Sequence, residues 1–338
     1  MGTKYFQGKV MNKMEYLELE RQYAKHLGLQ NVVAVNTGTA ALHVALEALQ
    51  LPAGSKVIIP EFTMYASALA AYYARLTPVF VDCDDNLLID LGKLEEAIDA
   101  DTKVIMVTHV YGRIVDMERV MYLAKKYNLR VIEDACEAQG ALYRGKPVGT
   151  FDIGCFSLYR NKIICAEEGG IVASEDKNFM EIVGDMKSMS FGTSHDYYHS
   201  QIGFNYRMTN SQAKIALKSL ENHSRNIERR ESIKEFFNNH FDEKFKMPNN
   251  REVVWVYDMK HPCADKVVKA LNKEGVVARH AFKPMSMMPL FEKKISVTEL
   301  NSFKKSTEVF YLHIHPEWEL GKLIKIAEKT QNILKNLK

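Results

Sequence analysis

The sequence contains a lysine in a setting that is unusual for a charged side chain. Lys162 lies between the apolar segment 155–158 and the glycine pair Gly169-Gly170. Burying an ammonium group costs free energy unless the group reacts or is paired with an opposite charge. A lysine that forms a Schiff base with a carbonyl compound is one solution to that cost. Lys162 is therefore the first candidate for a catalytic residue.

An acidic residue and a helix start could act together with this lysine. Asp134 ends a predicted apolar strand, and open α/β folds bind ligands at the carboxyl ends of parallel strands. Gly38 and Thr39 follow another strand pattern and open a helical one, and free backbone N–H groups at such a start bind anions. Taken singly, each signal is ambiguous. Asp134 could cap a turn, and an N-cap threonine explains the other segment about as well.

A fourth segment and the three above match the needs of one cofactor. Residues 203–210 form a polar and aromatic cluster that could close a site in its own subunit or in a neighbour's. Pyridoxal phosphate (PLP) needs a lysine for its aldehyde, an acid facing its pyridinium nitrogen and a helix terminus for its phosphate. The sequence therefore predicts PLP, and its pyridoxamine form, as the cofactor.

The elements that must position these residues alternate along the first two-thirds of the chain. Apolar runs without two-residue alternation predict strands that are buried on both faces. Their regular alternation with helical patterns predicts βαβ units and a parallel sheet, an α/β fold. The predicted strands are 31–35, 55–60, 78–84, 103–112 and 130–135, and the predicted helices are 39–51, 66–76, 93–100 and 117–128.

The pattern changes near residue 210. A long, charged helical stretch covers 211–241, followed by a predicted strand at 253–259 and helices at 267–275 and 322–336. We predict a large cofactor-binding domain over 1–215, and a linking helix with a small C-terminal domain over 216–338.

Composition narrows the choice of partners and compartment. Lys and Arg number 45 against 42 Asp and Glu, a net charge of +3 that gives no case for nucleic acid. No apolar run approaches the roughly 20 residues that span a membrane, and the first residues lack a signal-peptide core. Five scattered cysteines form no C-x-x-C pair, which predicts reduced thiols and a cytoplasmic protein.

Two further motifs fail on inspection. Gly140 to Lys146 fits the first part of a P-loop, but Pro147 stands where that loop needs Ser or Thr, so a hairpin turn is the better interpretation. His195 and His199 mimic the spacing of a zinc-protease helix, but their surroundings are rich in Gly and Ser and the acid is Asp. We predict no metal site.

Taken in order, the motifs identify a family. The chain resembles the DegT/DnrJ/EryC1/StrS family of PLP-dependent sugar aminotransferases from about Gly8 to near its end. The resemblance implies PLP fold type I: a large domain with a mainly parallel seven-stranded sheet between helices, and a smaller C-terminal α+β domain. Within the family, the later segments are most similar to 4-aminotransferases of the GDP-perosamine synthase type. The segments that carry the resemblance are NTGTAALHVAL, PVFVDCD, THVYG, VIEDACEAQGA, CFSLYRNKIICAEEGG, GFNYRMTNSQAKIAL and AFKPMSMMP.

The resemblance assigns roles to residues of this sequence. Lys162 would form the Schiff base and shuttle a proton, and Asp134 would pair with the pyridine nitrogen. Glu137 would lie near the ring hydroxyl. The resemblance implies phosphate contacts from Gly38, Thr39 and Ser157, and from Asn205 of a partner subunit in a homodimer with shared sites. The residues implied on the substrate side are His109, Tyr111, Arg207, Phe282, Lys283 and Met285.

The implied reaction moves an amino group from an amino acid, with glutamate the expected donor. The acceptor would be C4 of a nucleotide-linked 4-keto-6-deoxy sugar, with GDP-4-keto-6-deoxymannose as one candidate. Three alternatives stay open: a PLP-dependent sugar dehydratase, a 3-aminotransferase for dTDP- or UDP-linked keto-sugars, and a non-catalytic binding protein. Dehydratases of the family carry His in place of the lysine, so Lys162 argues against the first.

The sequence departs from the family pattern at four places. Met64 stands where an aromatic residue usually stacks on the cofactor ring, and either Met64 or Tyr65 could take that role. Glu167 replaces the first glycine of the usual G-E-G-G, and Ser286 replaces a common histidine. The N-terminal segment is about one helix shorter than usual, from which we expect a more open acceptor site.

Overall fold

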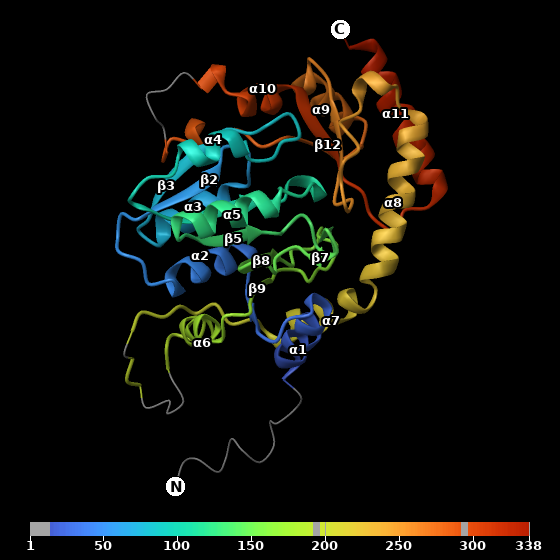
Figure 1. Cartoon of the computed structure of the whole chain (residues 1–338). Helices are drawn as coiled ribbons and strands as arrows, with labels where there is room; N and C mark the ends of the chain where they lie inside the picture. Colours follow the sequence, from blue (N-terminus) through green and yellow to red (C-terminus); the bar gives the residue numbers. More distant parts are fainter. Residues whose placement is uncertain (1–13, 192–196, 200, 292–296, 338) are drawn as a thin grey trace.

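The computed structural model describes residues 14–191, 197–199, 201–291 and 297–337. A seven-stranded sheet lies at the centre of the larger part of the chain (Figure 1). Its strands are β1 (Val32–Val35), β2 (Lys56–Pro60), β3 (Thr77–Val81), β4 (Thr102–Thr108), β5 (Arg130–Asp134), β8 (Ile153–Ser157) and β9 (Gly170–Ser174).

The strand order is β1-β9-β8-β5-β4-β2-β3. The pairs from β8 through β3 are parallel, and β9 pairs antiparallel with both β8 and β1. In a mainly parallel sheet the strand ends collect at one edge, which is where Asp134 and Ser157 end their strands. The predicted α/β fold with a mainly parallel seven-stranded sheet is confirmed.

Helices cover both faces of this sheet. The helices of the larger part are α1 (Glu15–Leu27), α2 (Gly38–Ala48), α3 (Tyr65–Tyr73), α4 (Leu91–Glu96), α5 (Met117–Tyr127), α6 (Lys177–Met186) and α7 (Asn210–Glu221). Successive residues of β2 point to opposite faces. Val57 and Ile59 pack among residues of α2, α3 and α6, whereas Ile58 packs among residues of α4 and α5. Burial on both faces explains why the strands show no polar alternation.

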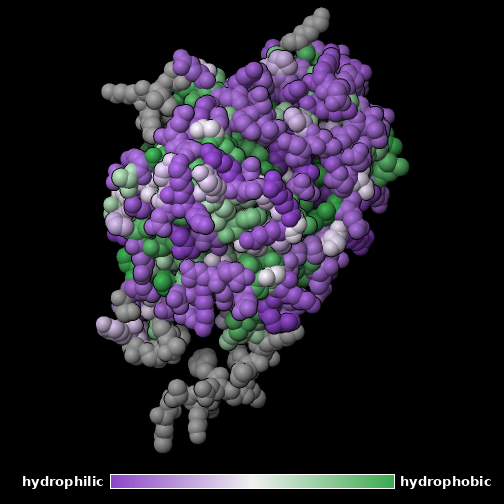
Figure 2. All heavy atoms as spheres, viewed as in Figure 1, coloured by the Kyte–Doolittle hydropathy of each residue, from purple (hydrophilic) through white to green (hydrophobic). Residues whose placement is uncertain are grey.

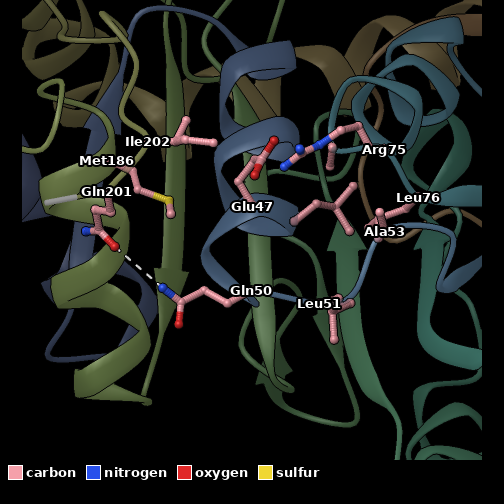
Figure 3. A pocket seen from close by; sticks show the side chains of 11 residues that line it. Glu47, Gln50, Leu51, Ala53, Arg75, Leu76, Met186, Gln201 and Ile202 are labelled. Atoms are coloured by element: carbon pink, nitrogen blue, oxygen red, sulfur yellow. Dashed lines mark hydrogen bonds between the residues drawn. The ribbon is translucent and has the colours of Figure 1, made fainter.

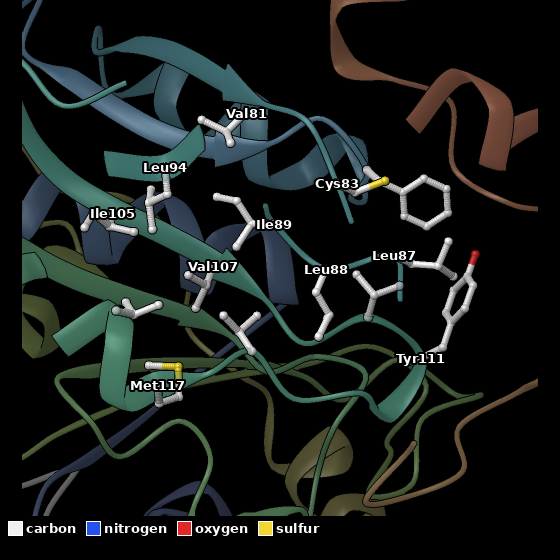
Figure 4. Packing of buried hydrophobic residues seen from close by; sticks show 14 of the residues in the cluster. Val81, Cys83, Leu87, Leu88, Ile89, Leu94, Ile105, Val107, Tyr111 and Met117 are labelled. Carbon is white, nitrogen blue, oxygen red and sulfur yellow. The ribbon is translucent and has the colours of Figure 1, made fainter. Parts of the chain in front are cut away.

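One of the resulting cores lies between the sheet and helices α4 and α5 (Figure 4). Ile105 and Val107 of β4 meet Leu94 of α4 and Met117 of α5 there. The same core continues to Tyr111 and Trp255, so it reaches from the large sheet to the C-terminal part of the chain.

The C-terminal part contains a second, antiparallel sheet in the order β10-β12-β11, which fits the implied smaller α+β domain. Helices α8 and α11 run alongside one another on its outer side (Figure 1). The predicted boundary between residues 215 and 216 falls within α7. The elements are α8 (His223–His240), β10 (Tyr257–Lys260), α9 (Ala264–Lys273), β11 (Ala278–His280), α10 (Asn301–Glu308), β12 (Val309–Leu312) and α11 (Leu320–Asn336).

Two predicted elements differ in detail. The helical stretch 211–241 is two helices, α7 and α8, that meet at Asn222, whose side-chain amide donates to the carbonyl of Lys218 at 2.8 Å. Such side-chain bonds to the backbone compete with helix continuation. Strand β10 begins at Tyr257 instead of residue 253. The carbonyl of Trp255 bonds to the Arg230 guanidinium at 2.7 Å instead of joining the sheet.

The hairpin prediction at residues 143–149 is confirmed. Strands β6 (Leu142–Tyr143) and β7 (Lys146–Pro147) pair antiparallel around Arg144 and Gly145. Both turn residues have positive φ, at 50° and 82°, as a two-residue hairpin loop of type I′ requires.

The surface is mostly polar on the face seen in Figure 2, where apolar side chains gather in smaller patches. Among the described residues, every helix is too short or too polar to cross a lipid bilayer.

A buried group of charges joins the two parts of the chain. Asp258 of β10 contacts Arg113 of the large part and Arg251 of the preceding loop, each at 2.8 Å. The three side chains are at most 3% exposed. Breaking a buried ion pair is strongly destabilising, because it leaves a charge without a partner in a poorly solvated place.

We expect Asp258→Ala to lower the free energy of unfolding by about 3–5 kcal/mol, because two buried guanidinium groups lose their carboxylate. Urea unfolding followed by circular dichroism measures this loss. Asp265→Ala, which removes exposed pairs with Lys269 and His280, is the control and should lower stability by no more than about 1 kcal/mol. Equal stability of the two variants would contradict the structural role of Asp258.

Candidate active site

A cavity of about 850 Å³ lies between the carboxyl edge of the large sheet and the C-terminal part of the chain. Its large-sheet wall includes Gly38, Asp134, Ser157 and Lys162. The fold thus brings together residues that lie more than a hundred positions apart in the sequence. The opposite wall comes from the C-terminal part and includes Trp255, Arg279, Phe282, Tyr311, His313, His315 and Trp318.

Lys162 lies in the turn that follows β8, where its backbone N–H donates to the carbonyl of Tyr159 at 2.8 Å. Its side chain is 10% exposed, and Nζ lies 3.9 Å from Oε1 of Glu137. Nζ also lies 3.6 Å from the ring centre of Trp255, within the range of a cation–π contact. The amine is therefore nearly buried, close to both a carboxyl group and an aromatic face, and lines the cavity.

Asp134 is held in one orientation at the end of β5. Its Oδ2 accepts the hydroxyl of Ser67 at 2.8 Å, and its Oδ1 accepts the N–H of Cys136 at 3.2 Å. Thr63 lies 3.3 Å from Ser67 and 2.8 Å from Thr108, so a chain of hydroxyl groups backs the carboxylate. The cavity thus receives an acid whose orientation is fixed by its buried partners.

The start of α2 forms a cradle with the end of β8. The Thr37 hydroxyl accepts the N–H of Ala40 at 3.0 Å and so caps the helix. A Cβ on Gly38 would lie only 2.7 Å from Cβ of Ser157, so this close approach requires glycine. Gly38, Thr39 and Ser157 all line the cavity at a helix N-terminus, which favours an anion.

Glu137 has the chemistry of a group that exchanges protons near neutral pH. Burial raises its pKa to about 7, against the opposing effect of the nearby Lys162 ammonium. Its Oε2 accepts the N–H of Tyr111 at 3.0 Å, and its Oε1 faces Lys162. A proton can therefore be held at Oε1, beside the lysine amine.

The C-terminal wall supplies residues that the sequence analysis missed. Nε of Arg279 donates to Nε2 of His313 at 3.3 Å. Burial, together with the nearby charge of Arg279, lowers the pKa of His313 to about 4, so this ring is neutral at pH 7. Burial raises the pKa of Tyr311 to about 12. The pair His313 and His315 after an apolar run was the signal available in the sequence.

The predicted residues fall into two groups. The first group lines the cavity. Besides Lys162, Asp134 and the cradle residues, it contains Met64, Glu137 and Phe282. Met64 is 53% exposed, whereas the neighbouring Tyr65 packs against the ring of Phe291. Glu167 is exposed, and Ser286 is buried with its N–H donated to Glu61 at 2.9 Å.

The other predicted residues do not line the cavity in the part of the chain that the structure describes. His109 is fully buried and contacts Glu133 at 3.1 Å, while Tyr111 packs against the rings of Phe282 and Tyr311. Met285 is buried, and the exposed residues are Lys283, Asn205 and Arg207. Roles for these residues stay predictions.

A second cavity of about 240 Å³ lies near the C-terminal end of α2 (Figure 3). Gln50 donates to Gln201 across it at 3.5 Å, and Glu47 and Arg75 also line it. Its lining contains no lysine, so it lacks the group needed for a Schiff base.

Of the two histidines with the spacing of a zinc-protease helix, His195 lies outside the described residues, and His199 contacts the carbonyl of Met189 at 2.7 Å.

The larger cavity fits PLP. The glycine-dependent cradle suits a phosphate, the fixed Asp134 suits a pyridinium nitrogen, and the nearly buried Lys162 suits an aldehyde. When bound, PLP supplies an electron sink that lets the C–H bond beside an amino nitrogen release its proton.

The comparisons with known proteins agree with this geometry. The profile of the DegT/DnrJ/EryC1/StrS aminotransferase family matches residues 5–331, and the chain belongs to this family. The GDP-perosamine synthase of Caulobacter vibrioides is 37% identical over 287 residues, covering 81% of this chain and 77% of that protein. The predicted family, aminotransferase class and PLP cofactor are confirmed.

Two other proteins are also similar. A UDP-N-acetyl-3-dehydro-alpha-D-glucosamine 3-aminotransferase of Acidithiobacillus ferrooxidans is 38% identical over 217 residues, covering 62% of this chain and 58% of that protein. The solved structure of PseC from Helicobacter pylori, an aminotransferase involved in the biosynthesis of pseudoaminic acid, has a TM-score of 0.90 at 23% identity. It covers 96% of this chain and 92% of that one. The predicted fold type I is confirmed.

Gly38→Ala should weaken PLP binding by about tenfold or more, because the new methyl group displaces Ser157 from the cradle. An absorbance titration of cofactor-free protein with PLP measures this change. Gly184→Ala on α6 has nothing within 4 Å of the added Cβ and is the control. Unchanged PLP affinity in a folded Gly38→Ala variant would show that the cradle does not bind the cofactor.

Proposed function

We propose that this enzyme transfers an amino group from glutamate to C4 of a GDP-linked 4-keto-6-deoxy sugar. The observation that carries the proposal is the nearly buried amine of Lys162 in one cavity with the fixed carboxylate of Asp134. The likeness to a GDP-perosamine synthase supports the choice of acceptor.

Three residues that line the cavity have different roles in this reaction. Asp134, whose two oxygens are fixed by Ser67 and Cys136, would face the ring nitrogen of the cofactor and balance its positive charge. Lys162 carries the proton at Nζ between the two carbon atoms that exchange it. Glu137, with a pKa of about 7, holds a proton at Oε1 within 3.9 Å of that amine.

A second candidate is a 3-aminotransferase for a UDP-linked keto-sugar. The 38% identity to the enzyme from Acidithiobacillus ferrooxidans favours it, although over a smaller share of the chain. Both candidates use the same lysine and differ in the acceptor. The sugar dehydratase is disfavoured because Lys162 is present.

The acceptor is tested by direct competition. We expect PLP-loaded protein with ¹⁵N-glutamate and equal amounts of GDP-4-keto-6-deoxymannose and UDP-3-keto-N-acetylglucosamine to place the label on C4 of the GDP sugar. Mass spectrometry and NMR identify the product, and Lys162→Ala should form none. Label on C3 of the UDP sugar would favour the second candidate, and label on neither sugar would reject both.

We also propose that the chain works as a homodimer with shared sites. Exposed apolar side chains occur on α3, at its N-cap and among residues 197–202 that the structure describes, and His43 of α2 contacts both Tyr73 and Phe204. Asn205 is exposed and does not line the cavity of its own subunit, which leaves it available to a partner. The most exposed of these side chains are Met64, Tyr72, Tyr73, Tyr197, Tyr198 and Ile202.

The predicted cytoplasmic location stays a prediction.

Mixing two inactive variants tests the shared site. Lys162→Ala and Asn205→Ala homodimers, unfolded together and refolded, should regain about a quarter of wild-type activity, because half of a random mixture is heterodimers with one intact site. Refolding each variant alone is the control. Activity that stays at the level of the separate variants would contradict a contribution of Asn205 across the interface.

A further inference from the structure

Trp255 lies directly against the lysine of the site, although no motif of the sequence predicts it. The ring centre is 3.6 Å from Nζ of Lys162, and the indole is 5% exposed. Trp255 belongs to the loop before β10, whereas Lys162 follows β8 of the large sheet. The contact therefore joins the two parts of the chain at the reacting amine.

The indole is also fixed to the backbone of the same turn. Its Nε1–H donates to the carbonyl of Asn161 at 3.0 Å, one residue before Lys162. The ring packs against Tyr111 and Tyr311, with ring centres 5.9 Å and 6.1 Å away. One side chain thus restrains both the backbone and the amine of the lysine turn.

A buried arginine fixes Trp255 in turn. Arg230 of α8 is 2% exposed, and its Nη1 donates to the carbonyl of Trp255 at 2.7 Å. Its Nη2 reaches the carbonyl of Asn161 at 3.5 Å. Burial lowers the pKa of Arg230 to about 10, so the guanidinium stays charged at neutral pH. The arginine therefore links the two carbonyl groups that border the indole contact.

We propose that Trp255 is a positioning residue for Lys162, and that Arg230 fixes Trp255 in place. Under the proposed function, Nζ of Lys162 is free during part of each turnover, and it must be held in the same position for the next step. A free ammonium at Nζ is held over the indole face and lies 3.9 Å from the Glu137 carboxyl group. Packing of the C-terminal part against the large sheet thereby fixes the position of the lysine amine.

Trace acetylation of cofactor-free, full-length protein tests the contact without any substrate. Trp255→Leu should raise the labelling rate of Lys162 by about 2- to 30-fold, the range of a cation–π contact, because a held ammonium does not react. Trp255→Phe keeps an aromatic face and should fall between Leu and the wild type. Lys187 is the internal reference, because its side chain is 11% exposed against 10% for Lys162 and it pairs with Glu20.

An unchanged ratio of Lys162 to Lys187 labelling in Trp255→Leu would overturn the proposal. Equal effects of Leu and Phe would also overturn it, because they would show that volume matters and the ring face does not. These outcomes do not depend on the acceptor, so the inference can fail while the proposed function stands, and the reverse also holds.

The PLP-loaded enzyme gives the second readout. A positioning role predicts that Trp255→Leu lowers kcat for the glutamate half-reaction by about tenfold or more and leaves KM for glutamate nearly unchanged. Arg230→Met should share this pattern. Arg225→Met, which changes an exposed arginine of the same helix, is the control. A rise in KM with constant kcat would instead assign Trp255 to substrate binding.

Discussion

The structure depends on keeping one lysine amine out of water and within reach of a ligand. An isolated buried ammonium is costly, and here the Glu137 carboxyl group at 3.9 Å and the Trp255 ring at 3.6 Å offset that cost. These two groups come from different parts of the chain. The site is therefore complete only when the C-terminal part is packed against the large sheet, which the Arg113–Asp258–Arg251 group secures.

The large sheet supplies the rest of the site through its strand ends. Asp134 ends β5, Ser157 ends β8, and Gly38 opens the helix after β1, so a mainly parallel sheet gathers them at one edge. Each has a local partner that fixes it: Ser67 for the carboxylate, and the close contact of Gly38 with Ser157 for the cradle. The C-terminal wall adds neutral His313 and the arginine Arg279, which both line the cavity.

The sequence predicted the parts of the site that depend on local patterns. Asp134 ends a strand and Gly38 opens a helix, places that periodicity reveals, and Lys162 is recognisable as a charge between an apolar segment and a glycine pair. Trp255, Arg230 and His313 were missed, because their roles come from packing between segments far apart in the chain. The long helix at 211–241 and the strand from residue 253 were wrong in detail for a related reason, since side-chain bonds by Asn222 and Arg230 replace backbone pairing there.

The most direct test of the account is the visible spectrum of PLP-loaded protein before and after glutamate, measured beside Lys162→Ala. The account predicts an absorption band from cofactor bound to the lysine, its absence in the variant, and its conversion by glutamate to the pyridoxamine form. A wild-type protein without the band, or a band that survives in Lys162→Ala, would contradict the central role of this lysine.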